Sequence, residues 1–322
     1  MKTLKKIIPT LIIALLLFQS CKDNDTDVVI IPETNTIVDI AVNEPDLSNL
    51  VTALGLADGN LVSLLSGGEY TLLAPNNFAF DLFLTNNGFS SLDDVPVDIL
   101  TNILLNHVVG GRLASTDLTT GYATTFALSS ASQASMSIFI DTSNGVRFNG
   151  VSSVSMADIS ADNGIVHVVD AVIGLPSVVT FAVADPTFST LVAALTRDDL
   201  TTDFVGVLST ATGTSPAPFT VFAPTNDAFG SLLSELGIAG LADIDEPTLD
   251  AVLKNHVVAG ANVFDTDLTD NMTVTTLGGD ITANVTGGAT LTDSNGRIID
   301  IIATNVQADN GVIHAINRVI LP

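Results

Sequence analysis

Four histidines are the side chains in this sequence best suited to acid–base chemistry or metal binding: His107, His167, His256 and His314. A zinc site would need further ligands at a workable spacing, and neither H-x-x-x-H nor H-E-x-x-H occurs. A Ser-His-Asp triad can follow any chain order, but the G-x-S-x-G turn that exposes a nucleophilic serine is absent, as are the phosphate-binding and dinucleotide-binding fingerprints. We therefore expect no catalytic residue, no metal and no cofactor.

Two of the histidines lie in segments whose alternation is typical of strands. His167 alternates with Ile165 and Val169, and His314 is flanked in the same way. This spacing puts each ring on the apolar face of a strand. We predict that both rings are buried and hydrogen-bonded, with a structural role, because buried polar groups in folded proteins almost always have partners.

Three short segments that contain aspartate could suggest calcium-binding sites. The segments 141–145 and 293–296 combine Asp, Ser and Asn with a final glycine, which favours hairpin loops over ion sites. A third run, 23–27, has the spacing Asp-x-Asp-x-Asp but lacks the loop glycine and distal glutamate of an EF-hand. We interpret this third run as part of a solvated tether.

The composition excludes several classes of protein. The 322 residues include 10 Lys+Arg and 35 Asp+Glu, so the formal net charge is 10 − 35 = −25, which argues against nucleic-acid binding. Hydrophobic residues reach 47% and charged residues only 14%, which excludes a disordered chain. A single cysteine allows neither an intramolecular disulfide nor a thiolate metal cluster.

The elements that must position these residues occur twice. Three blocks recur in the same order, at separations of 149, 149 and 147 residues, which indicates a duplicated domain. The paired blocks are 71–80 with 220–229, 106–109 with 255–258, and 161–167 with 308–314. A period near 148 is far above that of solenoid repeats, so we expect each copy to fold alone.

Helical signals fill the first half of each copy. Apolar residues at i, i+3, i+4 and i+7 predict an amphipathic helix that opens each domain, at 47–54 and 188–195. The segments that begin at Thr71 and Thr220 are predicted to be short apolar strands that end at a proline. The polar residues that follow each proline in the sequence can cap the next helix. A third helix begins near Pro96 or Pro247.

The second half of each copy is rich in Val, Ile and Thr with glycine punctuation, which is typical of β-structure. Asn163-Gly164 and Asn310-Gly311 predict hairpin turns, since both residues of such a pair tolerate positive φ. Helices followed by strands give an α+β fold for each copy.

These blocks resemble the fasciclin domain. Residues 220–229 read Thr-Val-Phe-Ala-Pro-Thr-Asn-Asp-Ala-Phe and match the family's first signature box, and Asn163 to His167 and Asn310 to His314 match its second. The resemblance implies a β-sheet wedge flanked by several helices, a role in cell adhesion or matrix binding, and usually no enzymatic activity. Animal members carry a Tyr-His pair linked to integrin contact.

The positions that match this Tyr-His pair are the candidate binding residues of the present chain. They are Asn106, His107, Asn255 and His256. The histidine carries over and the tyrosine does not, which counts against recognition of the integrin type. A structural role for these residues is the alternative.

The N-terminus resembles a bacterial lipoprotein signal. Three lysines precede an apolar run, residues 7–18, and Cys21 lies where cleavage would make it the first mature, lipid-carrying residue. Phe18 and Gln19 depart from the usual pattern, and an ordinary signal peptide is the alternative. We expect a signal peptide at 1–20, a lipidated cysteine and acidic tether at 21–34, and two fasciclin-like domains at 35–175 and 176–322.

Together these features predict a non-enzymatic adhesion or extracellular binding module, exported to the outer membrane or cell surface and anchored through Cys21. Its expected partners are a protein or polysaccharide on a cell surface or matrix and the membrane that holds the anchor, and not nucleic acid. One alternative is an accessory envelope lipoprotein that binds polysaccharide or a protein for uptake, and a further one is an unrecognised hydrolase. An exposed apolar patch would favour adhesion, whereas a concave site with shifted pKa values would favour hydrolysis.

Overall fold

The computed structural model describes residues 35–322, in which the same set of elements is built twice. The predicted signal peptide, Cys21 and the acidic tether lie outside the described residues. The first copy consists of α1 (Ile37–Asn43), α2 (Ser48–Leu56), α3 (Leu61–Gly67), β1 (Tyr70–Pro75), α4 (Asn77–Asn87), α5 (Val97–Asn106), β2 (Val108–Gly110), β3 (Gly121–Leu128), β4 (Ser135–Asp141), β5 (Arg147–Phe148), β6 (Ser152–Ala161) and β7 (Gly164–Val169).

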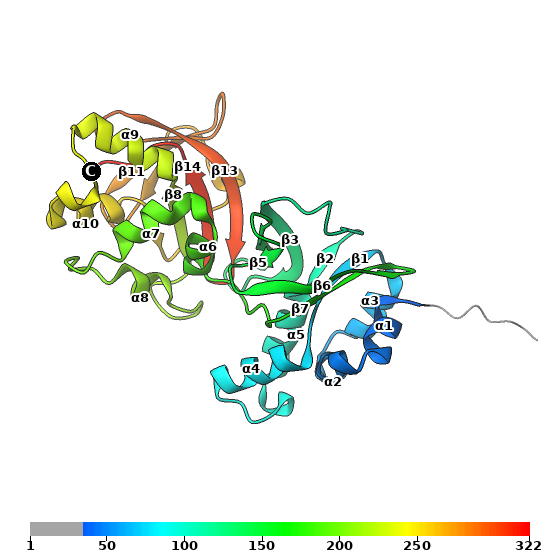
Figure 1. Ribbon diagram of the computed structural model, residues 1–322. Coiled ribbons are helices and arrows are strands. Elements are labelled where there is room, and N and C mark those ends of the chain that lie inside the picture. Colours follow the sequence, from blue (N-terminus) through cyan, green and yellow to red (C-terminus); the bar gives the residue numbers. More distant parts are fainter. Residues whose placement is uncertain (1–34) are drawn as a thin grey trace, which may run out of the picture. The chain divides into compact units, whose positions relative to one another are not determined.

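The second copy repeats this order with small changes of length. It consists of α6 (Val178–Ala184), α7 (Ser189–Leu195), α8 (Phe204–Leu208), β8 (Phe219–Pro224), α9 (Asn226–Leu236), α10 (Glu246–Lys254), β9 (Val257–Ala259), β10 (Met272–Thr275), β11 (Asp280–Asn284), β12 (Thr290–Thr292), β13 (Ile298–Ala308) and β14 (Gly311–Ile316). Helices come first and strands later in both copies, so the predicted α+β class is confirmed (Figure 1).

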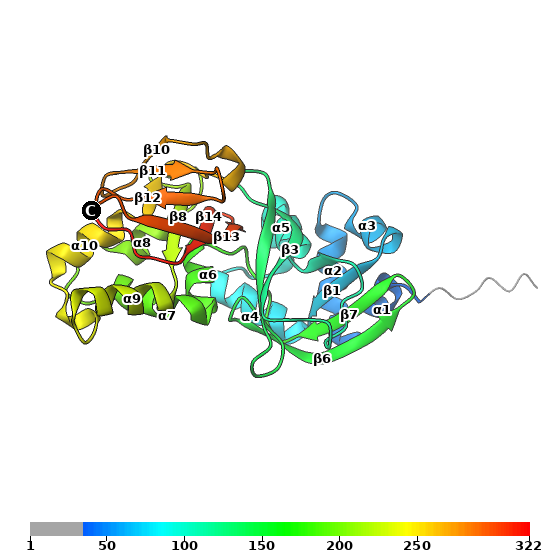
Figure 2. The same ribbon diagram turned by 90° about the horizontal axis from the view of Figure 1, so that it is seen from above.

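The two sheets share one strand order, but only the first sheet closes on itself. In the first copy seven strands close into a barrel, because β1 pairs with β2 on one side and, in parallel, with β7 on the other. In the second copy the order is β10-β11-β12-β13-β14-β8-β9, with β8 parallel to β14. Helices α7 and α9 lie on one side of this second copy and strands β10, β11 and β12 on the other (Figure 2).

Local sequence explains where the helices start. The side chain of Asn76 accepts a hydrogen bond from the backbone of Ala79 at the start of α4, and Thr225 does the same for α9. The residues behind the two prolines therefore cap these helices, as predicted. The expected opening helices are present as α2 and α7, but each is preceded by a seven-residue helix, α1 or α6, that the periodicity did not indicate.

The hairpins at the two Asn-Gly pairs form one residue earlier than predicted. Ala161 pairs with Gly164, so the turn residues are Asp162 and Asn163, and Gly164 is the first residue of β7. The glycine is needed for another reason: a Cβ on it would lie 2.0 Å from the carbonyl oxygen of Tyr70 on the parallel strand β1. Close approach of strands, and not turn conformation, therefore explains this glycine.

Each copy buries two apolar clusters, one beneath its helices and one enclosed by its strands. No single helix among residues 35–322 is both long and apolar enough to cross a bilayer. Two bent pairs, α2 with α3 and α6 with α7, together with the 3-10 turns that precede α2 and α7, pass that test of length and composition when each pair is taken jointly. Their inward faces contribute to the clusters.

One cluster crosses from the first copy to the second. Phe139 of β4 is 2% exposed and belongs to the cluster that contains Phe181 of α6. Tyr122 packs edge-on against Phe181 and donates a hydrogen bond from its hydroxyl to Asp185 at 3.0 Å. These contacts bury apolar surface of α6 that a separate second copy would expose to water.

This shared contact refines the expectation that each copy folds alone. We expect a fragment of residues 177–322 to unfold cooperatively but to be less stable than the same copy in the full chain by about 2 kcal/mol or more, because Phe181 loses its ring contact with Tyr122 and Asp185 loses its hydrogen bond to the Tyr122 hydroxyl. Thermal unfolding of the fragment and of the full chain tests this. A fragment without a cooperative transition would mean that the copies share one core, and an unchanged midpoint would mean that the contact contributes nothing.

Candidate functional site

The four candidate binding residues lie at the carboxyl ends of two equivalent helices. Asn106 is the last residue of α5 and His107 caps it, whereas Asn255 caps α10 and His256 follows. Their exposed fractions are 0%, 0%, 3% and 2% in that order. A ligand on the surface would not touch these side chains, and their predicted role in binding stays a prediction.

Both helix-end histidines use each ring nitrogen in the same way. In the first copy the Nδ1–H of His107 donates to the Ile103 carbonyl at 2.8 Å, and Nε2 accepts from the amide of Ile173 at 2.9 Å. His256 repeats this with Val252 and Ile320, at the same two distances. Because a carbonyl can only accept and an amide can only donate, each ring is the neutral tautomer with its proton on Nδ1.

Burial determines the charge state of these two rings. Desolvation lowers the pKa of His107 and of His256 from 6.5 to about 4, and the hydrogen bonds to Ile103 and Val252 only partly oppose it. At neutral pH both rings are therefore uncharged, enclosed and fully hydrogen-bonded. A ring in this state offers no free nitrogen to a substrate or a metal ion. Each ring instead acts as a clamp, by which we mean that its two hydrogen bonds hold the end of the helix to a segment distant in sequence, at Ile173 or Ile320.

The two asparagines next to these histidines are held differently. The amide group of Asn106 donates to the carbonyls of Ile173 and Gly174 at 3.3 and 3.0 Å, and its oxygen accepts from Thr125. Asn255 instead donates back to Ala251 in its own helix, at 3.0 Å. The asparagine thus joins the clamp in the first copy but not in the second.

The strand histidines are buried, as predicted, and carry the opposite tautomer. His167 and His314 are both 0% exposed. In His167 the amide of Asp158 donates to Nδ1 at 3.2 Å, and the Nε2–H donates to the Leu113 carbonyl at 2.9 Å. His314 has equivalent partners, and its ring stacks on Phe222 at 5.7 Å between centroids.

The asparagines of the second signature box tie the hairpin to the helices. The side-chain oxygen of Asn310 accepts from the amide of Val178 at 3.0 Å, and its amide group donates to the carbonyls of Leu208 and Thr210 at 2.8 and 3.0 Å. Asn163 repeats the first of these bonds with Ile37. The box is therefore a structural motif that fixes the ends of the short helices to the sheet.

Sequence reasoning missed the polar contacts between the copies. Ser129 donates to the Ala308 carbonyl at 2.7 Å, and the backbone amide of Gln307 donates to Ser137 at 3.0 Å. These residues are more than 165 positions apart. No local pattern marks them, because isolated serines and a glutamine occur on most protein surfaces. Among residues 35–322, no three His, Cys, Asp or Glu side chains lie close enough to hold a metal ion.

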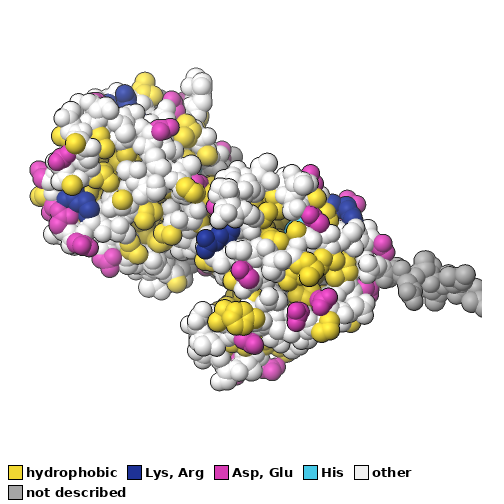
Figure 3. All heavy atoms as spheres, viewed as in Figure 1, with side chains coloured by type: hydrophobic (Ala, Val, Ile, Leu, Met, Phe, Trp, Pro, Cys, Tyr) yellow, Lys and Arg dark blue, Asp and Glu magenta, His cyan; other side chains and the backbone are white. Residues whose placement is uncertain are grey.

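An exposed apolar face distinguishes the first copy from the second. Phe78 and Leu82 of α4 are 64% and 41% exposed and lie one helical turn apart on the same face. The equivalent positions of α9 carry Asp227 and Ser231. Hydrophobic side chains reach the surface over the part of the molecule where Figure 1 places α4 (Figure 3).

Comparison with known protein families gives one match that covers most of the chain. The sequence model described as the Fasciclin domain matches residues 45–176 and again residues 186–322. Each matched segment covers one structural copy except for its first helix, α1 or α6. The duplication found in the sequence and in the structure is therefore a duplication of this domain.

Two relatives and one solved structure are similar to parts or most of the chain. "Uncharacterized protein sll1735" of Synechocystis sp. is 38% identical over 148 residues, 46% of this chain and 98% of that protein. "Cell surface glycolipoprotein MPB83" of Mycobacterium bovis is 42% identical over 77 residues, 22% of this chain and 33% of that protein. A FAS1 domain pair from the insect cell adhesion molecule Fasciclin I shares the fold, with a TM-score of 0.53 at 20% identity over 86% of this chain and 97% of that chain.

Proposed function

Because the chain belongs to the fasciclin domain family, we propose that it is a non-enzymatic adhesion or binding module of the cell surface, anchored in a membrane through a lipidated Cys21. The similar MPB83 is named as a cell surface glycolipoprotein, and the similar FAS1 pair comes from a cell adhesion molecule. Both names support a surface location. The partner is a protein or polysaccharide of a cell surface or extracellular matrix.

The observation that carries the proposal is the exposed apolar face of α4. Burial of a Phe or Leu side chain in a contact contributes about 1.5–3 kcal/mol of binding free energy. Phe78 is 64% exposed, so most of its ring is not used in the core of its own domain and is free to contact a partner. With a formal net charge of −25, the chain repels anionic surfaces over long distances. Short-range apolar contact at α4 supplies attraction that salt does not screen.

The four buried helix-end residues fit this proposal indirectly. His107 joins the end of α5 to Ile173, just before the second copy begins. His256 joins α10 to Ile320 near the end of the chain. The proposed role of these residues is to hold the shape of each copy, so that the contact surface is rigid when a partner arrives.

Replacement of the two exposed residues of α4 by the residues at the equivalent positions of α9 tests whether the partner binds at α4. Phe78→Asp with Leu82→Ser should reduce retention on envelope or matrix material at least about tenfold, because two buried apolar side chains are lost from the contact. Met156→Ser, at a residue that is 57% exposed on β6, is the matched control and should retain full binding. Equal retention of both variants would exclude α4 as the contact.

The anchor requires a separate test. We expect Cys21→Ala to leave the protein without lipid and to release it from the membrane fraction, because a multiply acylated cysteine anchors stably and no other lipid site is proposed. Metabolic labelling with a fatty-acid analogue, followed by fractionation, measures both effects. Label that persists in the Cys21→Ala variant would contradict the proposed anchor and leave the adhesion proposal to its own test.

A further inference from the structure

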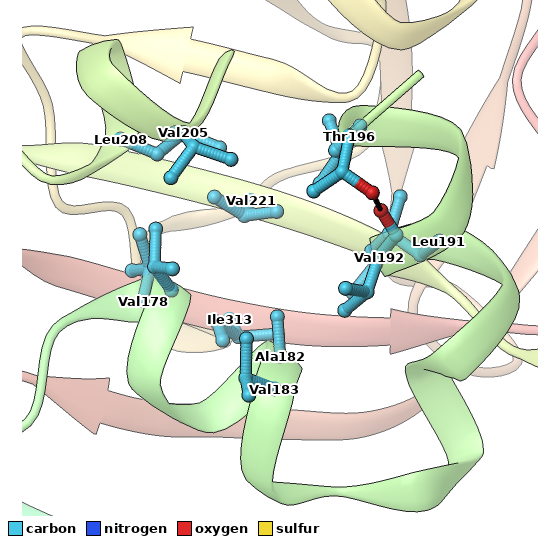
Figure 4. A pocket seen from close by; sticks show the side chains of 13 residues that line it. Val178, Ala182, Val183, Leu191, Val192, Thr196, Val205, Leu208, Val221 and Ile313 are labelled. Atoms are coloured by element: carbon cyan, nitrogen blue, oxygen red, sulfur yellow. Dashed lines mark hydrogen bonds between the residues drawn. The ribbon is translucent and has the colours of Figure 1, made fainter. Parts of the chain in front are cut away.

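The second copy contains an apolar cavity, open to solvent on one side, that the proposed function does not use. Its volume is about 120 Å³, and its lining presents no polar surface. Thr196 lies on its wall, but the threonine hydroxyl donates to the Val192 carbonyl at 2.8 Å and is thereby satisfied. Side chains from α6, α7 and α8 face one another across the cavity, with Val221 and Ile313 from the strands behind them (Figure 4).

Register identifies the equivalent positions in the first copy. Val221 pairs with Ile313 just as Leu72 pairs with Val166 in the first copy. The amide of Val178 donates to Asn310 of the second signature box, just as the amide of Ile37 donates to the equivalent Asn163. Val178 therefore carries one carbon less than Ile37. In the strand pair the sizes are exchanged, since Val221 is one carbon smaller than Leu72 and Ile313 is one carbon larger than Val166.

The cavity opens to solvent through exposed valines. Val183 and Val205 line it and are 65% and 39% exposed, so the mouth lies between α6 and α8. Ala182, on its wall, is partly exposed, whereas Ala41 at the equivalent position of the first copy is 1% exposed. A small apolar molecule can therefore reach the interior of the second copy from outside.

Charge near the mouth selects among apolar ligands. The loop 197–203 joins the wall residue Thr196 to α8 and carries Asp198, Asp199 and Asp203. Its one cation, Arg197, is already bonded to Asp199. The loop thus has a net negative charge of two, which repels a carboxylate head group and tolerates a neutral or cationic one.

We propose that this cavity binds the end of an alkyl chain that carries a neutral or cationic head group. A dry apolar cavity of about 150 Å³ in another protein accepts benzene, so about 120 Å³ accommodates roughly four or five carbon atoms. The chain end replaces empty space with contacts to valine and leucine, and the head group remains outside at the mouth. This site is independent of the α4 face and of the proposed adhesion.

Titration of the purified full chain with three five-carbon probes tests the proposal. The probes are 1-pentanol, pentylammonium and pentanoate, followed through the methyl NMR signals of the valines. Pentanol and pentylammonium should shift the signals of Val178 and Val221 with dissociation constants on the order of 1 mM, the value expected for burial of about five methylene groups. Pentanoate should bind at least about tenfold more weakly.

Larger side chains on two walls provide the test variant. Val178→Ile with Val221→Leu adds one carbon to each of these walls, and should weaken pentanol binding at least about tenfold because the added carbons occupy the space that the probe would fill. Unchanged binding in the filled variant, binding of none of the three probes, or equal affinity for pentanoate would overturn the proposal.

Discussion

Acidification from pH 7 to pH 4 should remove about 6 kcal/mol of stability from this protein, because two buried histidines must stay neutral in the folded state. The pKa of His107 and of His256 falls from 6.5 to about 4 on folding. Each pKa unit corresponds to about 1.4 kcal/mol, so each histidine accounts for roughly 3 kcal/mol. That is a large part of the 5–15 kcal/mol that stabilises a typical domain.

The sign follows from where the protons bind. Between pH 6.5 and pH 4 the unfolded chain protonates these rings and the folded chain does not, so stability falls as the pH falls through this window. Above pH 6.5 the contribution is fully present, and below pH 4 it changes no further. Burial also lowers the pKa of His314, which acts in the same direction.

Glutamine at the two positions separates this effect from general acid lability. The side chain of Gln has an NH2 donor group and an acceptor oxygen, so it can replace the donor and the acceptor of the neutral ring, but it cannot take up a proton. His107→Gln with His256→Gln should abolish most of the loss between pH 6.5 and pH 4, measured by urea unfolding at fixed pH values. Asp250 and Asp265 have lowered pKa values, so the stability that they contribute is lost as the pH falls from the ordinary carboxyl pKa of 3.8 downward, mostly below the histidine window. An undiminished slope in the double variant would show that these histidines are not the cause.

Gly311→Ala should be among the most destabilising single substitutions in the chain, with a cost of at least about 3 kcal/mol. A Cβ at this position would lie 2.3 Å from the carbonyl oxygen of Phe219, far inside the contact distance. Gly311 begins β14 and pairs with Phe219 on the parallel strand β8, so the two central strands of the second copy would have to separate. Denaturant unfolding of the variant measures the cost.

Another glycine of the same copy provides the control. Gly230 lies in α9, where an added Cβ would meet nothing within 4 Å. Gly230→Ala should stabilise the helix by up to about 1 kcal/mol, since alanine loses less backbone entropy than glycine. A cost below 1 kcal/mol for Gly311→Ala would mean that the strands adjust easily, and the explanation of this glycine would be wrong.

Most of the fold could be predicted from the sequence, because its signals are local. The recurrence of the Thr71 and Asn106 blocks revealed the duplication. The prolines that end β1 and β8 marked the strand ends, and the polar residues that follow these prolines cap α4 and α9. The alternation around His167 correctly predicted a buried strand histidine. In each case the residues that decide the structure are neighbours in sequence.

The remainder depends on contacts between distant residues. Asn163-Gly164 suggested a turn from its own preference, but the side-chain oxygen of Asn163 accepts from the amide of Ile37 and the glycine faces Tyr70, and both partners lie more than 90 residues away. The same is true of Gln307 and Ser137 between the copies. The apolar cavity is lined by residues of three helices and two strands between positions 178 and 313, which no local pattern brings together.

Retention of coated beads tests the central claim most directly. Beads that carry residues 35–322 are washed over cell-envelope or matrix material and compared with beads that carry each copy alone and with uncoated beads. Because α4 of the first copy carries the proposed contact and α9 has Asp227 and Ser231 at the equivalent positions, we predict that the pair and the first copy are retained and that the second copy is retained at least about tenfold less. If no coated bead is retained above the uncoated ones while the same protein hydrolyses an ester or a glycoside, the adhesion proposal is wrong and the chain is an enzyme.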